Sequence, residues 1–396
     1  MRRLPPITHP RTLQWLALLA LCCPLVMMFR PLPWMLVQHI PPLRPLEGAV
    51  ELAPTPQPSL QAWLSGQLQE QTERYLNDHI GLRPFMVRVH NQLEYSLYGR
   101  IHARSVVEGS EGYLFECGYI EARNGDDFVG DSTIYSNAQR IRQVQDSLLC
   151  HGVQLAFCFA PGKAHLLPHY APQKLLHTPT RTNYEAYRSA FEQLGVQHID
   201  LSAWLLDMQQ TDTCSCPIYS KHGTHWSHNA MLMAADSLIG YAAHLLGQPL
   251  PRIKRGPMRR SRWPRRTDND IGTALNLLFL PPAEVLCYPS VAFEPHVEHR
   301  PNVLVIADSY FKEMYHLGVT DSVFGPGSEY WFYGSWQLFG HRDDGRTNLV
   351  GVGPKEYLQE LLCRDLIIVL NTDAKLPSIG FDFYQRSAGA FGIDTE

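Results

Sequence analysis

The 396-residue sequence lacks the glycine-rich motifs that bind nucleotide phosphates, since neither G-x-x-x-x-G-K-[ST] nor G-x-G-x-x-G occurs in it. It also lacks a strong excess of either charge, and a formal net charge of -4 gives no reason to expect nucleic acid as a partner. Its nine cysteines are too sparse for the disulfide framework of a small secreted domain, and no common zinc spacing is present. We therefore predict no metal site and no nucleic-acid partner.

A long uncharged run occurs at the N-terminus. Residues 12–29 carry no charge, and Arg2, Arg3 and Arg11 precede them. A run of this length is near the lower limit for a spanning helix, and the preceding positive charges favour a cytoplasmic N-terminus. A cleaved signal peptide and a lipid-modified Cys22 stay open as alternatives. We predict a cytoplasmic segment at 1–11, a signal anchor at 12–36, a proline-rich periplasmic linker at 37–59 and a catalytic domain at 60–396.

The remaining chain alternates apolar strands with helices. Continuous apolar runs at 153–159, 302–306 and 366–370 are typical of buried strands, whereas 184–195 and 229–246 have the composition of helices. Such alternation predicts an α/β domain whose central sheet is mostly parallel. Hydrophobic residues make up 45% of the chain and charged residues 18%, which fits a globular protein.

One segment of this domain is strongly basic. Residues 252–266 contain eight Lys and Arg residues and are interrupted by Pro257 and Pro264. The prolines predict a solvated loop without helix. Contact with an anionic polymer or with phospholipid headgroups is the functional alternative.

Two short segments carry candidate catalytic side chains. Ser309 follows the apolar strand 302–306, and ligands of open α/β sheets bind outside the carboxyl ends of the strands. A serine hydroxyl needs a base to act as a nucleophile, and His225 is the candidate because it lies in a Thr-His-Trp sequence just ahead of a predicted helix. The backbone N–H of Ser309 is a candidate oxyanion donor.

Several motifs, in this order and spacing, resemble the alginate O-acetyltransferase J and X proteins, whose catalytic domain is SGNH-hydrolase-like. The resemblance runs from about residue 68 to about residue 375. The segments that carry it are 76–85 (LNDHIGLRPF), 109–115 (GSEGYLF), 159–164 (FAPGKA), 219–226 (YSKHGTHW), 268–272 (DNDIG) and 307–309 (ADS). The resemblance implies a three-layer α/β fold, Ser309 as the residue that accepts the acetyl group and His225 as its base.

The sequence departs from this family at one position. The family usually has Asp-Thr-His-Trp, with the aspartate orienting the histidine, but this chain has Gly223 in its place. Another acceptor must then orient His225, and the residues considered for that role or as oxyanion donors are His222, Asp268, Asp270 and Asn371. A backbone carbonyl is a further possibility. The candidates for contact with substrate are Lys163, Trp226, Asp308 and Tyr310.

The resemblance implies an O-acetyltransferase that moves acetyl groups to hydroxyls of an exopolysaccharide through an acetyl-Ser309 intermediate. Its expected acetyl donor is a membrane-bound O-acyltransferase, and no cofactor of its own is expected. The expected location is the bacterial inner membrane, crossed once, with the catalytic domain in the periplasm. Two alternatives stay open: an acetylesterase of the same fold, and a degenerate polysaccharide-binding or scaffold protein that lost its triad aspartate.

Overall fold

The computed structural model describes residues 14, 15, 18, 22, 45–48, 52–80, 83–211, 215–295, 299–338, 346–348 and 352–393. The predicted cytoplasmic segment and most of the predicted signal anchor lie outside these residues. Among the residues that are described, no helix is both long and apolar enough to cross a bilayer.

The chain forms two compact units. The first, which we call the helical unit, comprises residues 1–104 and 273–280, and the second, the sheet unit, comprises residues 105–272 and 281–396. The described helices of the helical unit are α3 (Leu60–Leu64), α4 (Gln67–His79) and α5 (Arg83–Tyr98). Ser59 caps α3, because its side chain accepts the backbone N–H of Ala62. The amide of Asn91 in α5 donates to the carbonyl of Leu275 and so fixes the returning segment.

A seven-stranded sheet forms the centre of the sheet unit, in the order β10-β9-β8-β7-β11-β3-β4. The three predicted strands lie side by side as β7 (Val303–Ala307), β11 (Leu366–Thr372) and β3 (Gln154–Ala160). Strands β4 (His198–Asp200) and β8 (Glu329–Phe332) extend the parallel part, whereas β9 (Trp336–Leu338) and β10 (Arg346–Asn348) are antiparallel. The prediction of a mostly parallel sheet is thus confirmed.

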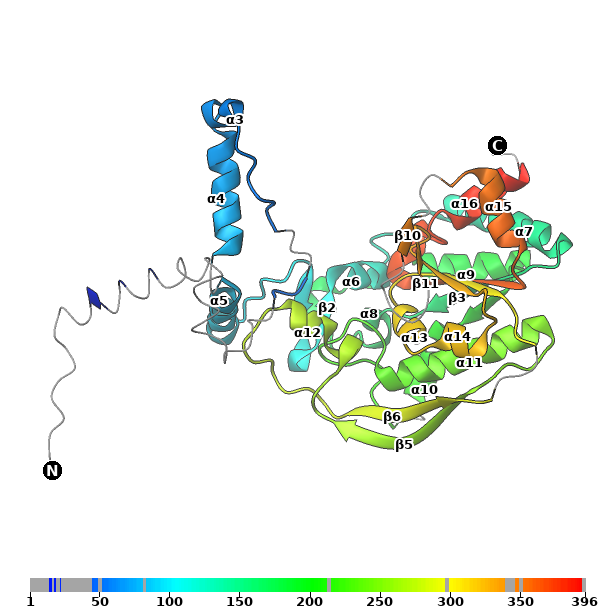
Figure 1. Ribbon diagram of the computed structural model, residues 1–396. Helices are drawn as coiled ribbons and strands as arrows, with labels where there is room; N and C mark the ends of the chain where they lie inside the picture. The colour runs from blue at the N-terminus through cyan, green and yellow to red at the C-terminus, as the bar shows by residue number, and fades with distance from the viewer. Residues whose placement is uncertain are drawn as a thin grey trace. The chain divides into compact units, whose positions relative to one another are not determined.

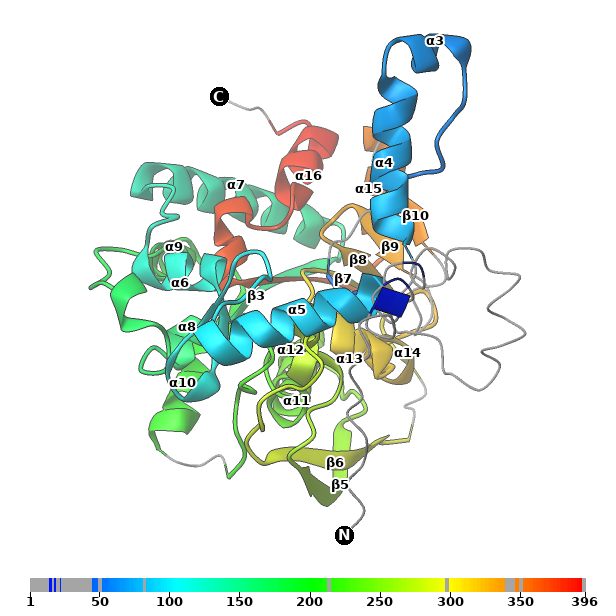
Figure 2. The ribbon, with the colours of Figure 1, turned by 90° about the vertical axis from the view of Figure 1, so that its left-hand side faces the viewer.

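Helices cover both faces of this sheet, which explains why its central strands are apolar throughout. In β7, Val303 and Val305 pack into the core on one face, and Leu304 and Ile306 pack into the core on the other. Figure 2 shows the two helical layers: α7 (Asp131–Cys150), α9 (Asn183–Leu194) and α16 (Phe383–Phe391) on one side, and α10 (Leu201–Gln210) and α11 (His228–Leu246) on the other. This arrangement is the predicted three-layer α/β fold.

The basic segment 252–266 forms a strand, which corrects the prediction of a loop. Strand β5 (Ile253–Ser261) pairs antiparallel with β6 (Leu286–Phe293), and its register shifts between Arg255 and Met258. Pro257 lies within this irregularity, where a missing backbone donor is tolerated. A disulfide from Cys216 to Cys287 ties β6 to the segment that leads to His225.

The remaining elements of the sheet unit are short or peripheral. They are β1 (Val106–Glu108), η1 (Ser110–Gly112), β2 (Leu114–Glu116), α6 (Cys117–Asn124), α8 (Lys163–Leu166), η2 (Gln173–Leu175), η3 (Arg266–Asn269), α12 (Asp270–Ala274, which ends in the helical unit), α13 (Lys312–His316), α14 (Val319–Val323), α15 (Pro354–Leu362) and η4 (Asp373–Ser378). Of these, α8 follows the carboxyl end of β3, and α13 follows the carboxyl end of β7 (Figure 1).

Candidate active site

Ser309 lies on a tight turn directly after β7. The turn is fixed by the buried carboxylate of Asp308, whose Oδ2 accepts the backbone N–H and the hydroxyl of Thr372 at 2.9 and 2.8 Å. Its Oδ1 accepts the N–H of Tyr310 at 3.0 Å. Burial raises the pKa of Asp308, although the hydrogen bonds from Thr372 and Tyr310 act against it. Asp308 therefore supports the nucleophile turn.

His225 lies just ahead of α11, in a segment that is held at both ends. Tyr219 and Trp226 form an isolated antiparallel bridge across the segment, and Ser227 caps α11 by accepting the N–H of Ala230. The ring of His225 faces the nucleophile turn, and its Nε2 lies 2.8 Å from Oγ of Ser309. The structure thus brings these two predicted side chains within hydrogen-bonding distance, although they are far apart in the sequence.

Asp270 is the candidate that contacts His225 on the far side of the ring. Its Oδ2 lies 2.5 Å from Nδ1 of His225. Its Oδ1 accepts the backbone N–H groups of Thr224 at 2.8 Å and of Ile271 at 2.7 Å. One oxygen of the carboxylate is therefore held by the backbone while the other fixes the orientation of the imidazole, as in serine hydrolases.

The absence of a side chain at position 223 has a steric reason. A Cβ on Gly223 would lie 2.5 Å from the carbonyl oxygen of Thr267 and 3.1 Å from Cα of Asp268. The segment that delivers Asp270 thus occupies the space that an aspartate at position 223 would need. In this chain, the path of residues 267–268 therefore leaves no room for a side chain at position 223.

The charge of Asp270 also changes the basicity of His225. Burial lowers the pKa of His225, but the hydrogen bond and the negative charge of Asp270 outweigh burial, and the net pKa lies above its ordinary value. A raised pKa makes the neutral imidazole a stronger proton acceptor. It also means that His225 becomes protonated at a higher pH than an ordinary histidine.

Tyr333 is a neighbour of Ser309 that the sequence did not indicate. It follows β8, and its backbone N–H donates to the carbonyl of Ala307 at 2.9 Å, which places it beside the nucleophile turn. Burial raises the pKa of the Tyr333 phenol, whereas hydrogen bonds with the side chain and the backbone of Ser309 act in the opposite direction. Its φ of 50° is in the left-handed region, which is rare for a bulky residue and is found mostly at functional sites.

The other orienting candidates do not contact His225. Asp268 is buried, and its Oδ1 accepts the N–H of His228, while burial raises its pKa to about 7. His222 is buried as well, and burial together with the charges of Lys163 and Lys221 lowers its pKa to about 4. The side chain of Asn371 accepts the N–H of Gly380. Of the four candidates, only Asp270 is brought to the triad.

The remaining substrate-contact candidates are packed into the core. Trp226 and Tyr310 are fully buried, and the hydroxyl of Tyr310 donates to the carbonyl of Thr224 at 2.8 Å. Lys163 is only 1% exposed, and its ammonium donates to three backbone carbonyls at 2.7 to 3.0 Å. These acceptors belong to Leu114, Lys221 and Gly223. Lys163 therefore clamps the loop that carries His225 and does not face a substrate.

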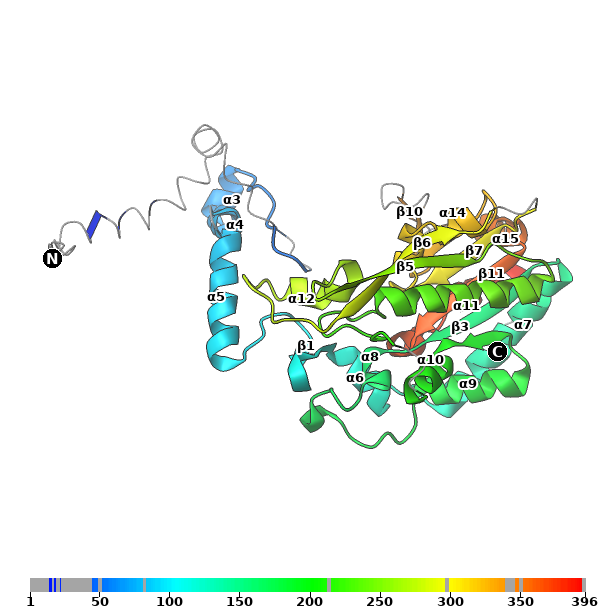
Figure 3. The ribbon, with the colours of Figure 1, turned by 90° about the horizontal axis from the view of Figure 1, so that it is seen from below.

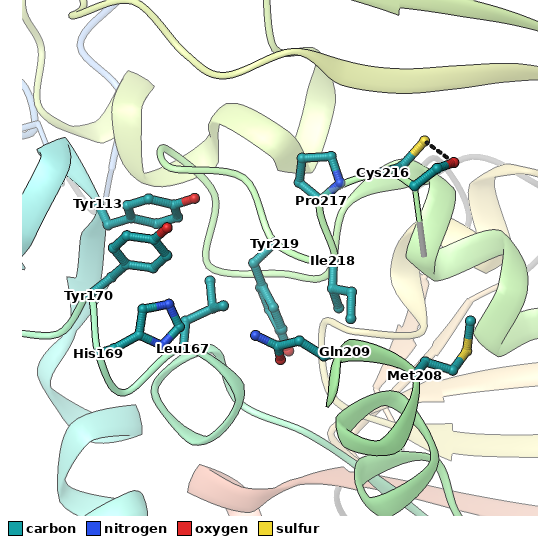
Figure 4. A pocket seen from close by; sticks show the side chains of 11 residues that line it. Tyr113, Leu167, His169, Tyr170, Met208, Gln209, Cys216, Pro217, Ile218 and Tyr219 are labelled. Carbon is teal, nitrogen blue, oxygen red and sulfur yellow. Dashed lines mark hydrogen bonds between the residues drawn. The ribbon is translucent and has the colours of Figure 1, made fainter. Parts of the chain in front are cut away.

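A separate hollow of about 390 Å³ lies elsewhere in the sheet unit (Figure 4). The rings of Tyr113 and Tyr170 stack at its side with their centroids 4.0 Å apart. Tyr219 lines it, and the hydroxyl of Tyr219 lies 3.4 Å from that of Tyr310, the residue after Ser309. None of the triad side chains lines this hollow.

The triad is suited to acyl transfer. A base beside a hydroxyl, with a carboxylate behind the base, can activate the hydroxyl for attack on an ester carbonyl. Within the part of the chain that the structure describes, no group of three or more His, Cys, Asp or Glu side chains is placed to hold a metal ion.

The comparison with protein families agrees with the predicted resemblance. Residues 106–282 match the family described as "SGNH hydrolase-like domain, acetyltransferase AlgX", which confirms the resemblance that the motifs indicated. The match contains His225 and Asp270 and ends before Ser309. No curated protein sequence matches this chain.

Several solved structures are similar to this chain, and three of them are described here. The O-acetyltransferase domain of Pseudomonas putida AlgJ is 19% identical with a TM-score of 0.46, and the alignment covers 73% of this chain and 99% of that domain. Pseudomonas aeruginosa AlgX is 16% identical with a TM-score of 0.43, covering 74% and 71%. Bacillus cereus PatB1, solved with a sulfonyl adduct, is 11% identical with a TM-score of 0.43, covering 70% and 99%. At these values the likenesses say nothing about substrates or the roles of residues.

Proposed function

We propose that this chain, a member of the SGNH hydrolase-like AlgX acetyltransferase family, transfers acetyl groups to hydroxyls of an exopolysaccharide through an acetyl-Ser309 intermediate. The observation that carries the proposal is the continuous contact from Asp270 through His225 to Ser309. The glycine at position 223 suggested that the orienting carboxylate was lost, and this favoured a degenerate, binding-only protein. Asp270 supplies that carboxylate from another segment. This contact therefore supports an enzyme over a scaffold.

The reaction has two steps. In the first, Nε2 of His225 takes the proton of the Ser309 hydroxyl while Oγ attacks the acetyl carbonyl of the donor. The tetrahedral oxyanion collapses, the donor's leaving oxygen takes the proton from His225, and the acetyl group stays on Oγ as an ester. In the second, His225 takes the proton of a sugar hydroxyl, the sugar oxygen attacks the ester, and Oγ of Ser309 leaves with that proton.

Charge develops on the carbonyl oxygen in both steps and needs donors that are already in place. The backbone N–H of Ser309 is one proposed donor. The phenol of Tyr333 is the second, because the backbone N–H of Tyr333 donates to the carbonyl of Ala307 and so places this residue beside the nucleophile turn. Its strained backbone fits this role, since strain is retained where the surrounding structure needs a particular side-chain position.

The cellular setting belongs to the same proposal. A signal anchor at 12–36 would hold the enzyme at the bacterial inner membrane, with the sheet unit in the periplasm. The acetyl donor would be a membrane-bound O-acyltransferase, which carries acetyl groups across the bilayer from the cytoplasm. The proposal requires no cofactor bound to this chain, because the serine itself carries the acetyl group.

The chemistry is tested by intact mass. The purified full chain is incubated with p-nitrophenyl acetate, and we expect a gain of one acetyl group that is absent from Ser309→Ala. Addition of an oligosaccharide should then discharge the acetyl-enzyme and give an acetylated oligosaccharide. Discharge to free acetate alone would instead support the esterase. A correctly folded chain that gains no acetyl group would contradict both activities and leave the scaffold alternative.

A further inference from the structure

Glu313 is a buried carboxylate that the proposed mechanism does not use. It lies in α13, four positions after Ser309, and its surface is only 5% exposed. The backbone ties α13 to the nucleophile turn, because the carbonyl of Ser309 accepts the N–H of Lys312 at 3.1 Å. A buried carboxylate is stable only when hydrogen-bond donors or positive charges surround its oxygens. The partners of Glu313 therefore show which parts of the chain it holds.

Each oxygen of this carboxylate contacts a different segment of the catalytic site. Oε1 lies 2.9 Å from Nδ1 of His228, the first residue of α11. Oε2 accepts a hydrogen bond from the hydroxyl of Thr267 in η3. His228 comes three positions after His225, and Thr267 comes three positions before Asp270. One carboxylate thus links the segments that supply the nucleophile, the base and the orienting carboxylate.

The contact between Asp270 and His225 depends on how far apart η3 and the start of α11 lie. Glu313 contacts both of these segments, so its two oxygens set this separation. Each contact point is three residues from a triad residue, and three extended residues span at most about 11 Å. A displacement at Glu313 would therefore reach Asp270 and His225. Misplacement of a catalytic group by about 1 Å can lower a rate about 10²-fold.

Strand β6 covers these contacts from outside. Figure 1 and Figure 3 show β5 and β6 as a ribbon along the outside of α11. The hydroxyl of Tyr288 in β6 accepts the N–H of Arg265 at 3.0 Å, and its ring centre lies 5.8 Å from that of His228. Asp268 is a further titratable group beside this pair, and its Oδ1 accepts the backbone N–H of His228 at 3.2 Å. The side chains of His228 and Glu313 are only 13% and 6% exposed, so salt screens their contact weakly.

Stabilisation of the fold alone is a simpler explanation, because breaking a buried ion pair destabilises a protein wherever the pair lies. The sheet unit offers a comparison in Glu329 and Arg364, whose side chains are 14% and 2% exposed and lie 3.1 Å apart. Glu329 begins β8 and aligns with Leu304, near the start of β7, so this pair lies at the end of the sheet opposite to Ser309. It joins β8 to the turn ahead of β11, and neither carries a triad residue. Both contacts of Glu313 lead to a catalytic segment, which favours a role in positioning.

The pKa of His225 reports whether Asp270 is in place. Burial lowers this pKa, and the hydrogen bond and the negative charge of Asp270 are the largest contributions that raise it. The charges of Asp308 and Glu116 raise it as well, by smaller amounts. A displaced Asp270 therefore lowers the pKa of His225 while the other charges stay in place. A change at Glu313 that only weakens the fold would not have this effect.

We propose that Glu313 is a positioning residue for the triad, which holds η3 and α11 at the separation at which Asp270 contacts His225. This inference rests on the proposed function for the reaction that the triad performs, and it adds the residue that keeps the three catalytic segments together. Glu313 touches no reacting atom and acts through Asp270.

The pH profile of Glu313→Ala tests this role. The variant loses both contacts, so kcat for p-nitrophenyl acetate should fall about 10²-fold while KM changes little. Because His225 must be neutral to act as a base, the acidic limb should also move to lower pH. Glu313→Gln keeps the volume and an oxygen acceptor, and it should restore most of kcat. The control Glu329→Ala removes the other buried pair and should leave both kcat and the acidic limb unchanged.

A double variant tests whether Glu313 acts through Asp270. Asp270→Asn/Glu313→Ala should have its acidic limb at the same pH as Asp270→Asn alone, because the charge that Glu313 holds beside His225 is already gone. The pKa of His225 is also read without turnover, from the pH dependence of its modification by diethyl pyrocarbonate in Ser309→Ala, followed by peptide mass. We expect a lower pKa when Glu313→Ala is added. This readout separates the two proposals, since it stays valid when Ser309 accepts no acetyl group.

Circular dichroism establishes that each variant is folded. If Glu313→Ala does not fold, Thr267→Val takes its place, because it removes one hydroxyl and should give the same changes at a smaller size. An unchanged pKa of His225 in a folded Glu313→Ala, or in Thr267→Val where the first does not fold, would overturn the proposal. An equal shift in Glu329→Ala, or a further shift in the double variant, would overturn it as well.

Discussion

The sheet unit contains two groups of charges whose surroundings differ. Around Ser309 the charges are buried, and each has partners: Asp308 accepts three hydrogen bonds, and the ammonium of Lys163 donates three. Along β5 the charges are of one sign and exposed. Buried charges are stable only when they are held in one geometry, whereas exposed charges move freely until a ligand pairs with them.

This difference separates two tasks that one enzyme must perform. Proton transfer requires atoms held within hydrogen-bonding distance, and a fixed, buried environment provides that. Capture of a polymer requires a long surface that tolerates many positions of the ligand, and exposed charges provide that. Changes near Ser309 should therefore act on the chemical step, whereas contact of the basic segment with an anionic polymer predicts that changes along β5 act on binding of the acceptor.

The largest effect is expected at Asp270, where the two oxygens of one carboxylate hold both His225 and its loop. We expect Asp270→Asn to lower kcat for p-nitrophenyl acetate by about 10⁴-fold, as in the serine-protease triad. The pH profile supplies a second readout. His225 must be neutral to act as a base, so the rate rises with pH through its pKa, which lies above its ordinary value in the unaltered chain.

Loss of the Asp270 charge lowers the pKa of His225, so the acidic limb of the profile should move to lower pH in Asp270→Asn while the plateau falls. Asp268→Asn is the matched control, because Asp268 is buried nearby but does not contact His225. A profile of Asp270→Asn whose acidic limb stays in place would show that Asp270 does not set the basicity of His225.

The next effect is expected at Tyr333. Tyr333→Phe removes the phenolic hydroxyl that we propose as an oxyanion donor and keeps the ring beside the nucleophile turn. Loss of one oxyanion donor typically lowers kcat by about 10²-fold or more, and KM for the small ester should change little. Tyr135→Phe, at an exposed tyrosine of α7, is the control. Unchanged kcat in Tyr333→Phe would remove Tyr333 from the mechanism and leave the Ser309 N–H as the remaining proposed donor.

A smaller effect on activity, with a clear effect on stability, is expected at Lys163. Lys163→Met keeps most of the volume of the side chain but takes the ammonium donor from three carbonyls, of which that of Lys221 keeps the backbone N–H of Leu114. Each unsatisfied buried polar group costs about 1–3 kcal/mol. The free energy of unfolding, measured with urea, should therefore fall by at most several kcal/mol. Because Gly223 then moves more freely ahead of His225, kcat should fall about tenfold while KM is retained.

Lys174→Met, at an exposed lysine, serves as the control for Lys163→Met. Normal stability of Lys163→Met would contradict the clamp, since the buried carbonyls of Leu114 and Gly223 cannot lose the ammonium donor without cost. A large rise in KM with unchanged kcat would instead return Lys163 to the role of a substrate contact.

The sequence predicted the parts of this site that follow from local pattern. Apolar runs identified β3, β7 and β11, and the position of Ser309 after β7 follows from the way parallel strands end at one edge of a sheet. Asp270 was one of four residues considered as partners of His225, and sequence alone had no means of choosing among them. The choice depends on the path of residues 267–270, which is set by their packing against Gly223.

The predicted substrate contacts share one structural feature. Trp226, Asp308 and Tyr310 are adjacent to His225 or Ser309 in the sequence, whereas Lys163 follows strand β3, and these positions favoured contact with substrate. Their side chains point into the core instead, where they fix the backbone of the two catalytic loops. Tyr333 was missed for the opposite reason, because it comes from a turn that no sequence signal connects to Ser309.

The basic segment was predicted as a loop because Pro257 argues against a regular strand, and the irregular register around it removes that objection.

The smallest expected effect distinguishes the two groups of charges by their response to salt. Salt screens exposed charges strongly and buried pairs weakly, and the Debye length shortens from about 10 Å at 0.1 M to about 3 Å at 1 M. Raising the NaCl concentration across this range should therefore lower the rate of acetyl transfer to a galacturonic acid hexamer several-fold. Acetylation of Ser309 by the neutral ester p-nitrophenyl acetate should change little, because it depends only on the half-buried and closely paired triad. In Arg260→Gln/Arg262→Gln the salt dependence of the transfer step should be shallower, since two of the screened charges are gone. Equal salt dependence of the two steps would mean that the exposed cations of β5 take no part in catalysis, because the same buried residues would then govern both.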